Sequence, residues 1–183
     1  MIWFTSDLHF GHENVIKYND RPFSGWKEMD GALIANWNAM VKPQDDIYIL
    51  GDLTLRGPQY ANPLLRRLNG RKYLICGNHD IFVRKSSFDR DQFVWIQTYY
   101  ELNVCGHWFI LFHYPIERWN GCLRKENGIF QGSIHLHGHQ HNRPSYNEEN
   151  RRQGVRRYDV GIDANAMHPV SIEKILSFFD LRI

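Results

Sequence analysis

The sequence predicts an α/β fold with a parallel core. Over residues 1–76, short apolar runs that end at glycine or polar residues alternate with segments of helical periodicity. This alternation of strand and helix is typical of parallel sheets joined by crossover helices. A chain of 183 residues can bury one proper core and has little room for a second. We therefore expect one domain over residues 1–183.

The first half is expected to hold three strands and two helices. Apolar residues at near-helical spacing, followed by Pro43, predict a helix over Trp26–Val41. A proline at its start and Gly70 behind it predict a shorter helix over Pro63–Leu68. The three strands are predicted over Met1–Thr5, Asp46–Leu50 and Lys72–Cys76.

The second half is richer in strands. Cys105 and Gly106 fit a tight hairpin turn between two of them. Two long polar connections, Tyr114–Gln131 and Asn142–Arg156, have a length that is usually functional or mobile. The predicted strands are Tyr99–Val104, Trp108–Phe112, Ser133–His137 and Arg157–Ile162, and a closing helix is predicted over Ile172–Phe179.

Composition narrows the compartment and the partners. A net charge of +2 gives no general reason to expect a polyanionic partner. The apolar runs are too short to span a bilayer, and the first residues lack the basic and apolar regions of a signal peptide. The three cysteines form no CxxC pair, which suits a reducing compartment. We expect a cytoplasmic protein with no membrane partner.

Side chains that can bind metal follow five of the predicted strands. Ligands of open α/β sheets bind beyond the carboxyl ends of the strands. Carboxylate and imidazole ligands without thiolate suit a hydrolytic divalent ion such as Mn²⁺, Fe²⁺ or Zn²⁺. Glycines beside three of these residues would let the backbone turn sharply into a shared pocket. In strand order the side chains are Asp7 and His9, Asp52, Asn78 and His79, His113, and His139 and His141.

Five short blocks, all in order between Asp7 and His141, resemble those of the calcineurin-like metallophosphoesterases. One block alone would be weak evidence. The opening Ser6–His12 and the short length resemble the small, single-domain bacterial and phage branch of that family. Leu55 departs from members with an acidic residue at this position, which weakens the analogy with protein Ser/Thr phosphatases. The blocks are Asp7-Leu8-His9, Gly51-Asp52, Gly77-Asn78-His79-Asp80, His113 and Gly138-His139-Gln140-His141.

The resemblance implies a fold and a dinuclear metal centre. The fold would be two stacked mixed β-sheets flanked by helices, an αββα sandwich. The centre would hold two divalent ions, Mn²⁺ first and Fe, Zn, Ni or Co as alternatives, bridged by Asp52. A metal-bridging hydroxide would attack phosphorus while His79 gives a proton to the leaving oxygen. One ion would be held by Asp7, His9, Asp52 and His141, and the other by Asp52, Asn78, His113 and His139.

The implied activity is hydrolysis of phosphate esters. Phosphodiesters from nucleotides or nucleic acid are favoured as substrates, because a chain this short has no large cap domain to close the site. A phosphomonoesterase with the same site is the alternative. Two further classes are a non-catalytic scaffold that retains the fold and a mononuclear iron oxygenase using Asp7 and His9. The oligomeric state stays open.

Three residues are expected to contact the substrate phosphate. They are His12, which could instead cap the helix that follows it, Arg56, which matches the arginine of the second family block, and Asn78. In a strand, His135 and His137 share one face, so we assign them to packing or to hydrogen bonds behind the ligands.

Two basic clusters occupy the long polar connections. Charged loops are mostly solvated, but these could also form a rim that binds substrate phosphate or a strip of nucleic acid. Trp119 and Tyr146 could stack a base there. The clusters are Arg118, Arg124 and Lys125 in the first connection, and Arg143, Arg151, Arg152, Arg156 and Arg157 in and after the second.

Overall fold

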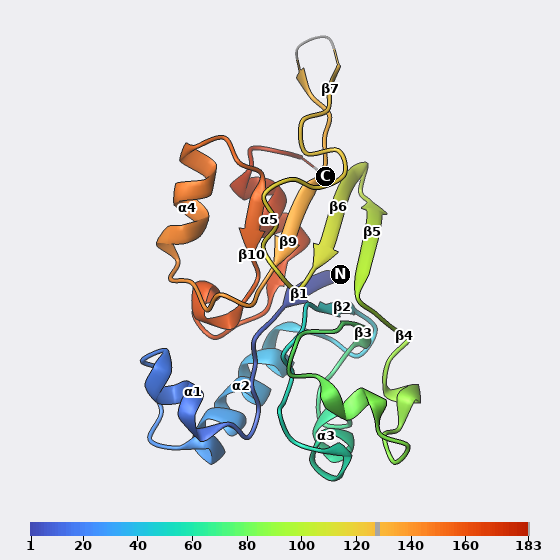
Figure 1. Ribbon diagram of the computed structural model, residues 1–183, viewed down its shortest axis with the longest axis vertical. Helices are drawn as coiled ribbons and strands as arrows, with labels where there is room; N and C mark the ends of the chain where they lie inside the picture. Colours follow the sequence, from blue (N-terminus) through green and yellow to red (C-terminus); the bar gives the residue numbers. More distant parts are fainter. Residues whose placement is uncertain (127–128, 183) are drawn as a thin grey trace.

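A computed structural model describes residues 1–126 and 129–182 and shows two mixed β-sheets (Figure 1). The strand order of the first sheet is β11-β1-β2-β3-β4. β1 to β4 run parallel to their neighbours, as predicted for the first three, and β11 is antiparallel to β1. The bounds of these strands are Ile2–Thr5 for β1, Asp46–Ile49 for β2, Arg71–Ile75 for β3, Trp95–Gln97 for β4 and Val170–Ser171 for β11.

The second sheet has the strand order β10-β9-β6-β5. β6, β9 and β10 are parallel, whereas β5 is antiparallel to β6. Cys105 and Gly106, with φ of 52° and 73°, form the two-residue turn between β5 and β6, which confirms the predicted hairpin. The strands are β5 Tyr99–Val104, β6 His107–Phe112, β9 Ile134–His137 and β10 Arg157–Asp159.

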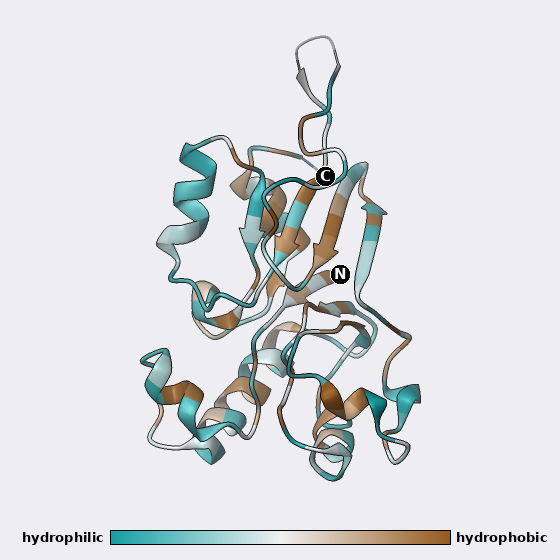
Figure 2. Cartoon of the chain, viewed as in Figure 1, coloured by the Kyte–Doolittle hydropathy of each residue, from teal (hydrophilic) through white to brown (hydrophobic). Residues whose placement is uncertain are grey.

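The first sheet is buried on both faces. Alternate residues of its strands point to opposite sides. Phe4 and Tyr48 join a core with the second sheet, where the Phe4 and Phe109 rings lie 6.0 Å apart. Trp3 and Ile47 join a second core with helices α2 and α3. The hydrophobic colouring of β6 and β9 in Figure 2 marks the core between the sheets.

Helices flank the paired sheets. α2 and α3 cover the outer face of the first sheet, and α4 lies beside β10. No helix within residues 1–126 and 129–182 has the length and apolar character needed to cross a bilayer. The helices are α1 Glu13–Tyr18, α2 Trp26–Met40, α3 Pro58–Leu65, α4 Ser145–Arg152 and α5 Ile172–Phe178, with 3₁₀ turns η1 Ile81–Arg84, η2 Arg90–Gln92 and η3 Ile162–Asn165.

The short helix predicted over Pro63–Leu68 is misplaced. In the structure α3 begins at Pro58, directly after the N-cap Gly57. Proline costs least at the first helical position, where its missing N–H has no partner in any case. Pro63 lies inside the helix, which ends two residues later at Leu65. Both Pro58 and Pro63 fit the first position of a helix, and the helix begins at Pro58.

Both long polar connections contain regular structure that the sequence analysis did not predict. Asn142–Arg156 contains α4. Tyr114–Gln131 contains a small hairpin of β7 (Lys125–Glu126) and β8 (Ile129–Phe130), with residues 127 and 128 between them outside the described chain. The strands β4 and β11 were also not predicted. The strand expected over Arg157–Ile162 ends earlier, at Asp159.

Candidate metal centre

Two groups of candidate metal ligands lie where the strands of both sheets end. Within each group, the donor atoms all lie within 4.8 Å of one another. The backbone N–H of His139 donates to both oxygens of the Asp7 carboxylate, at 3.0 and 2.9 Å, and so ties one group to the other. The first group is Asp7, His9 and His141, and the second is Asp52, His113 and His139.

Asp52 belongs to the second group and also reaches the first, so its carboxylate lies between the other ligands of the two groups. Its Oδ2 is 3.6 Å from the Nε2 of His9 and 3.6 Å from the Nε2 of His113. Asn78 joins the second group, since its Oδ1 is 3.1 Å from both His113 Nε2 and His139 Nδ1. The structure therefore brings the seven predicted ligands into one cluster, and the division of these ligands between two ions remains a prediction.

Most of these residues have a left-handed backbone. Non-glycine residues seldom have positive φ, and those that do gather at functional sites, where the surrounding structure holds them. Each such turn aims its side chain at the cluster instead of continuing its strand. The residues and their φ values are Asp7 56°, His9 50°, Asp52 55°, His139 74° and His141 50°.

Two glycines permit close approach at the cluster. A Cβ on Gly77 would lie 2.2 Å from Asp52 Oδ1, and one on Gly138 would lie 2.3 Å from Asp7 Oδ2. Of the three glycines expected to supply sharp turns, only Gly51, with φ of 93°, has a left-handed backbone. Gly77 and Gly138 have no positive φ, and the missing Cβ of each leaves room for a carboxylate oxygen.

Burial gives the cluster the electrostatics of a cation site. Burial, together with the carboxylates of Asp159 and Asp52, raises the pKa of Asp7 well above its usual value. Burial also lowers the pKa of His9 to about 2 and lowers the pKa of His113. Neutral imidazoles have a lone pair free for a metal, and divalent ions would relieve the repulsion among the carboxylates. The buried Nδ1 of His9 has no hydrogen-bond partner among the described residues. This donor set fits divalent cations.

His79 lies at the mouth of the cluster. Its side chain is 41% exposed, and its Nε2 is 4.0 Å from Asp52 Oδ2. Its backbone N–H donates to Asp52 Oδ1 at 2.9 Å. The neighbouring Asp80 carboxylate accepts the N–H groups of Gly77, Asp52 and Leu53 at 2.8 to 2.9 Å. Asp80 therefore holds the turn that carries His79 against the turn that carries Asp52.

His12 lies at the edge of the cluster. Its ring centroid is 5.6 Å from that of His9, and its side chain makes no capping hydrogen bond to α1. The capping alternative is therefore not observed. A substrate contact by His12 remains a prediction.

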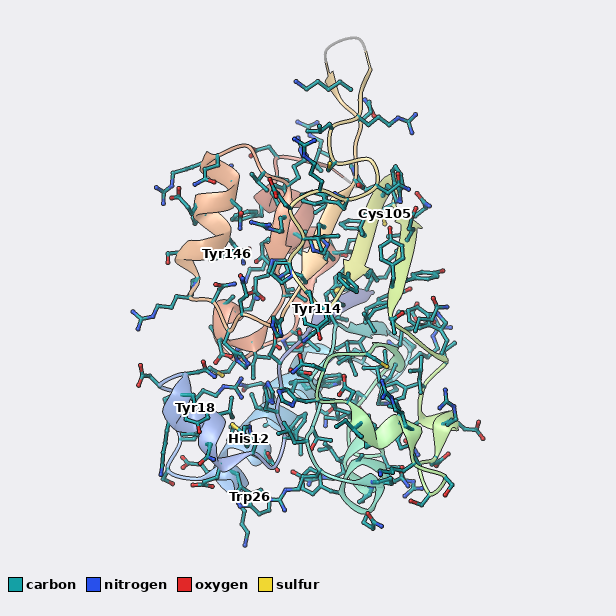
Figure 3. All side chains as sticks on the ribbon, viewed as in Figure 1. His12, Tyr18, Trp26, Cys105, Tyr114 and Tyr146 are labelled. Carbon is teal, nitrogen blue, oxygen red and sulfur yellow. The ribbon has the colours of Figure 1, made fainter. Side chains whose placement is uncertain are left out.

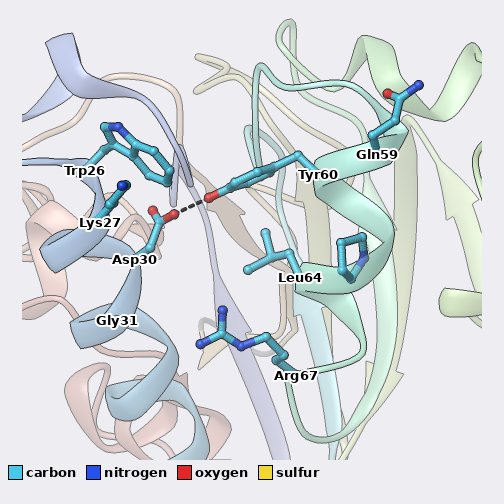
Figure 4. A pocket seen from close by; sticks show the side chains of 9 residues that line it. Trp26, Lys27, Asp30, Gly31, Gln59, Tyr60, Leu64 and Arg67 are labelled. Atoms are coloured by element: carbon cyan, nitrogen blue, oxygen red, sulfur yellow. Dashed lines mark hydrogen bonds between the residues drawn. The ribbon is translucent and has the colours of Figure 1, made fainter.

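The guanidinium of Arg56 is held on the protein backbone. Its Nε and Nη2 donate to the carbonyl oxygen of Gly11 at 3.0 and 2.9 Å, and it stacks over Trp26 at 5.0 Å from the ring centroid. Asp30 accepts the Gly11 N–H at 2.8 Å and also the Tyr60 hydroxyl (Figure 4). Arg56 thus fixes the turn before His12, and its contact with substrate remains a prediction.

Arg21 and Asp163 support the first group and escaped the sequence analysis. Asp163 Oδ2 is 2.8 Å from His141 Nδ1 and accepts from Arg21 Nη2 at 2.8 Å. The buried Arg21 also donates to the carbonyl oxygens of Asp7 and Leu8, at 2.7 and 3.0 Å. One buried ion pair therefore orients the candidate ligand His141 and the turn that carries Asp7. No local pattern marks either residue.

The outer face of β9 is covered by aromatic residues. His135 and His137 are buried there, as predicted. Trp119 is only 9% exposed, with its ring centroid 5.3 Å from that of His135 and its Nε1 donating to Ser133 O at 3.3 Å. The Tyr146 hydroxyl is 3.3 Å from His137 Nε2. The expectation that Trp119 stacks a base was wrong, because the ring is buried against its own sheet.

Several of the loop arginines have partners within the protein. Arg151 pairs with Asp180 at 3.0 Å and Arg152 with Glu149 at 3.1 Å. Arg157 donates to the Ile116 carbonyl oxygen at 3.1 Å. These contacts favour the interpretation of the second cluster as surface and packing charges.

Comparison with known proteins identifies the family. The sequence profile named calcineurin-like phosphoesterase matches residues 1–113 of the chain. The chain belongs to this family. The matched segment ends at His113, so His139 and His141 lie beyond it, and the structure is what places these two residues with the other ligands.

Similarity to known proteins covers most or nearly all of this calcineurin-like chain. An uncharacterised protein of Methanocaldococcus jannaschii is 33% identical, over 98% of this chain and 91% of its own. The gene 66 protein of Mycobacterium phage D29 is 32% identical, over 89% of this chain and 88% of its own. A crystal structure of a protein of unknown function from Aquifex aeolicus matches with a TM-score of 0.71 and 27% identity, over 97% and 98% of the two chains.

Proposed function

We propose that this protein is a dinuclear metal-dependent phosphodiesterase that acts on a nucleotide or on a nucleic-acid-derived ester. The observation that carries the proposal is the position of the Asp52 carboxylate between two groups of candidate ligands. Hydrolysis of phosphomonoesters by the same site is the second candidate. Loading with Mn²⁺ and a cytoplasmic location, which the free cysteines suit, belong to the same proposal.

The candidate histidine ligands His9 and His113 would hold the ions without competition from protons. The low pKa of His9 and His113 leaves both rings neutral at pH 7, and Asp52 offers one oxygen to both groups. Bound divalent ions would lower the pKa of water and neutralise charge that develops on the phosphoryl oxygens. The buried surroundings of Asp7 strengthen this attraction, because water does not screen it.

His79 is the proposed proton donor to the leaving oxygen. Its half-exposed ring can exchange protons with solvent, and its Nε2 stands 4.0 Å from the carboxylate shared by both groups. The hydrogen bonds of Asp80 fix the turn that carries it. A positioned acid of this kind contributes roughly 10²–10⁴-fold in rate.

The preference for diesters is supported by the open side of the site. His79 is 41% exposed, and the β7–β8 hairpin points away from the strand ends that carry the ligands (Figure 1). A diester carries groups on both sides of its phosphorus and therefore needs an open approach. A monoester does not need one.

The test compares bis-p-nitrophenyl phosphate with p-nitrophenyl phosphate on protein loaded with Mn²⁺. We expect turnover of both compounds, with the higher kcat/KM for the diester. A higher kcat/KM for the monoester would favour the second candidate. Protein that holds two ions per chain and hydrolyses neither compound would refute the proposal.

A further inference from the structure

A cavity opens directly beside the second ligand group. Its volume is about 550 Å³, within the range of roughly 300–1,000 Å³ that is typical of small-molecule sites. Asn78 belongs to both the cavity and the ligand cluster. The cavity is lined by Cys76, Gly77, Asn78, Asp80, Ile81, Val83, Arg84, Thr98, Phe112 and Tyr114.

The ring of Tyr114 lines the cavity and contacts two of the candidate ligands. Its centroid is 4.6 Å from the ring of His139 and 4.9 Å from the ring of His113, and both pairs are edge-to-face. The Phe112 ring, which also lines the cavity, lies 5.5 Å from it. Figure 3 shows Tyr114 near the middle of the molecule, below the second sheet. A phosphate at the cluster would therefore have its ester group next to an aromatic wall.

The lining suits a planar ring better than a small polar alcohol. Ile81, Val83 and Phe112 supply apolar surface to the cavity. Ile81 is 56% exposed, so part of its apolar side chain is free to contact a ligand. Both Asp80 oxygens accept backbone N–H groups, so this carboxylate faces its own turn. The exposed Arg84 adds a cation with a planar guanidinium, which can stack on a base or bind its carbonyl oxygen.

We propose that this cavity binds the nucleobase of the substrate, against Ile81, Phe112 and Tyr114, with Arg84 at its rim. The inference rests on the proposed function and narrows its substrate class to nucleotidyl esters. The phosphate would lie at the ligand cluster, and the shared Asn78 and Tyr114 would set the register between phosphate and base.

The test measures what the base alone adds to binding. Thymidine 5′-monophosphate and 2-deoxyribose 5-phosphate carry the same phosphate and sugar, so their dissociation constants on Mn²⁺-loaded protein differ through the base. Calorimetry should show that the nucleotide binds about tenfold more tightly, the size expected for base stacking on an aromatic surface. Ile81→Asp should reduce this ratio to near one, because it places a solvated anion on the apolar wall.

Val94→Asp is the matched control. Val94 is 58% exposed and lies outside the cavity, so the ratio should stay at the wild-type value. A wild-type ratio near one, or the same ratio in Ile81→Asp as in wild type, would overturn the inference. A ratio of dissociation constants near one in Val94→Asp would also overturn the inference, because the effect would then come from added charge and not from the cavity. Hydrolysis of bis-p-nitrophenyl phosphate without a base effect refutes only the cavity, and a base effect without hydrolysis refutes the proposed function.

Discussion

The two ligand groups are held in place by different means. Behind the first group lies an ion pair of Arg21 and Asp163, whose partners are 142 residues apart and whose carboxylate reaches His141. Behind the second group lie hydrogen bonds to backbone. The Leu50 carbonyl oxygen is 2.7 Å from His113 Nδ1, and the Asp80 carboxylate accepts three N–H groups from nearby turns.

The contacts that support His113 and Asp52 join residues that are closer in the sequence than the two partners of the ion pair behind the first group. The support of Asp52 and His113 lies within residues 50–113, inside the segment that matches the family, whereas His139 of the same group is bonded through its backbone N–H to Asp7. The support of the first group depends on two buried charges, and removal of one leaves the other uncompensated. We therefore expect the first group to be the more sensitive to changes far from the ligands.

Asp52→Ala should have the largest effect, because it removes the carboxylate between the two groups. We expect metal content to fall and turnover of bis-p-nitrophenyl phosphate to drop by roughly 10³-fold or more, as loss of metal-based charge stabilisation costs several kcal/mol. Elemental analysis and steady-state kinetics measure both. Asp91→Ala, at an exposed aspartate, is the control and should change neither. Full metal content in Asp52→Ala would show that Asp52 is no ligand.

His79→Ala tests the proposed proton donor, which lies beside the second group and is not one of the candidate ligands. Both ions should stay bound, while kcat falls by about 10²–10⁴-fold through loss of the proton donor. A substrate with a better leaving group should suffer less, because it needs less protonation. Unchanged kcat on a poor leaving group would remove His79 from the mechanism.

Asp163→Asn tests whether the two groups are supported independently. Asp163→Asn weakens the acceptor at His141 Nδ1, so one of two Mn²⁺ ions should bind about 10–100-fold more weakly. The other ion should keep its affinity, since His113 and the turn that carries Asp52 are held by hydrogen bonds that do not involve Asp163. Calorimetric titration with Mn²⁺ resolves the two events. Equal weakening of both ions would show that the groups are not independently supported.

The clustering of the candidate ligands could be predicted, whereas the contacts that support them could not. Asp7, His113 and His139 each follow a strand, and strand ends can be located from short apolar runs. Arg21 and Asp163 follow no such pattern, because a single charge in a loop resembles a solvated residue until the fold buries it. Pairing across the chain is a tertiary property and leaves no periodic signal.

Helix α4 was missed for a related reason. Its buried residues are Asn147 and Asn150, where an amphipathic helix would bury apolar side chains. Asn147 exchanges hydrogen bonds with the backbone of Asp159, at 2.7 and 3.1 Å, and so fastens the helix to the end of β10. Hydrophobic periodicity cannot detect a helix that packs through amides.

The smallest effect concerns a buried histidine away from both groups. Burial lowers the pKa of His135 from 6.5 to about 3. Below pH 6.5 the unfolded chain takes up a proton at this residue and the folded chain does not, so stability is lost as pH falls from 6.5 towards 3. At pH 5 this amounts to ~2 kcal/mol.

Urea denaturation of metal-free protein at pH 7.5 and pH 5 measures this loss. The drop between the two pH values should be smaller in His135→Leu than in wild type. His168→Leu, outside the buried set, is the control and should keep the wild-type drop. An identical drop in His135→Leu would show that His135 does not resist protonation in the fold.

The most direct test of the account is the electron paramagnetic resonance spectrum of Mn²⁺-loaded protein, recorded together with its metal content. Two ions that share Asp52 are close enough for their spins to couple, as in two-metal sites with ions ~3.5–4 Å apart. We predict two Mn²⁺ per chain and the spectrum of a coupled pair, which Asp52→Asn should convert to that of isolated ions. One ion per chain, or two ions without coupling in the wild-type protein, would contradict the account.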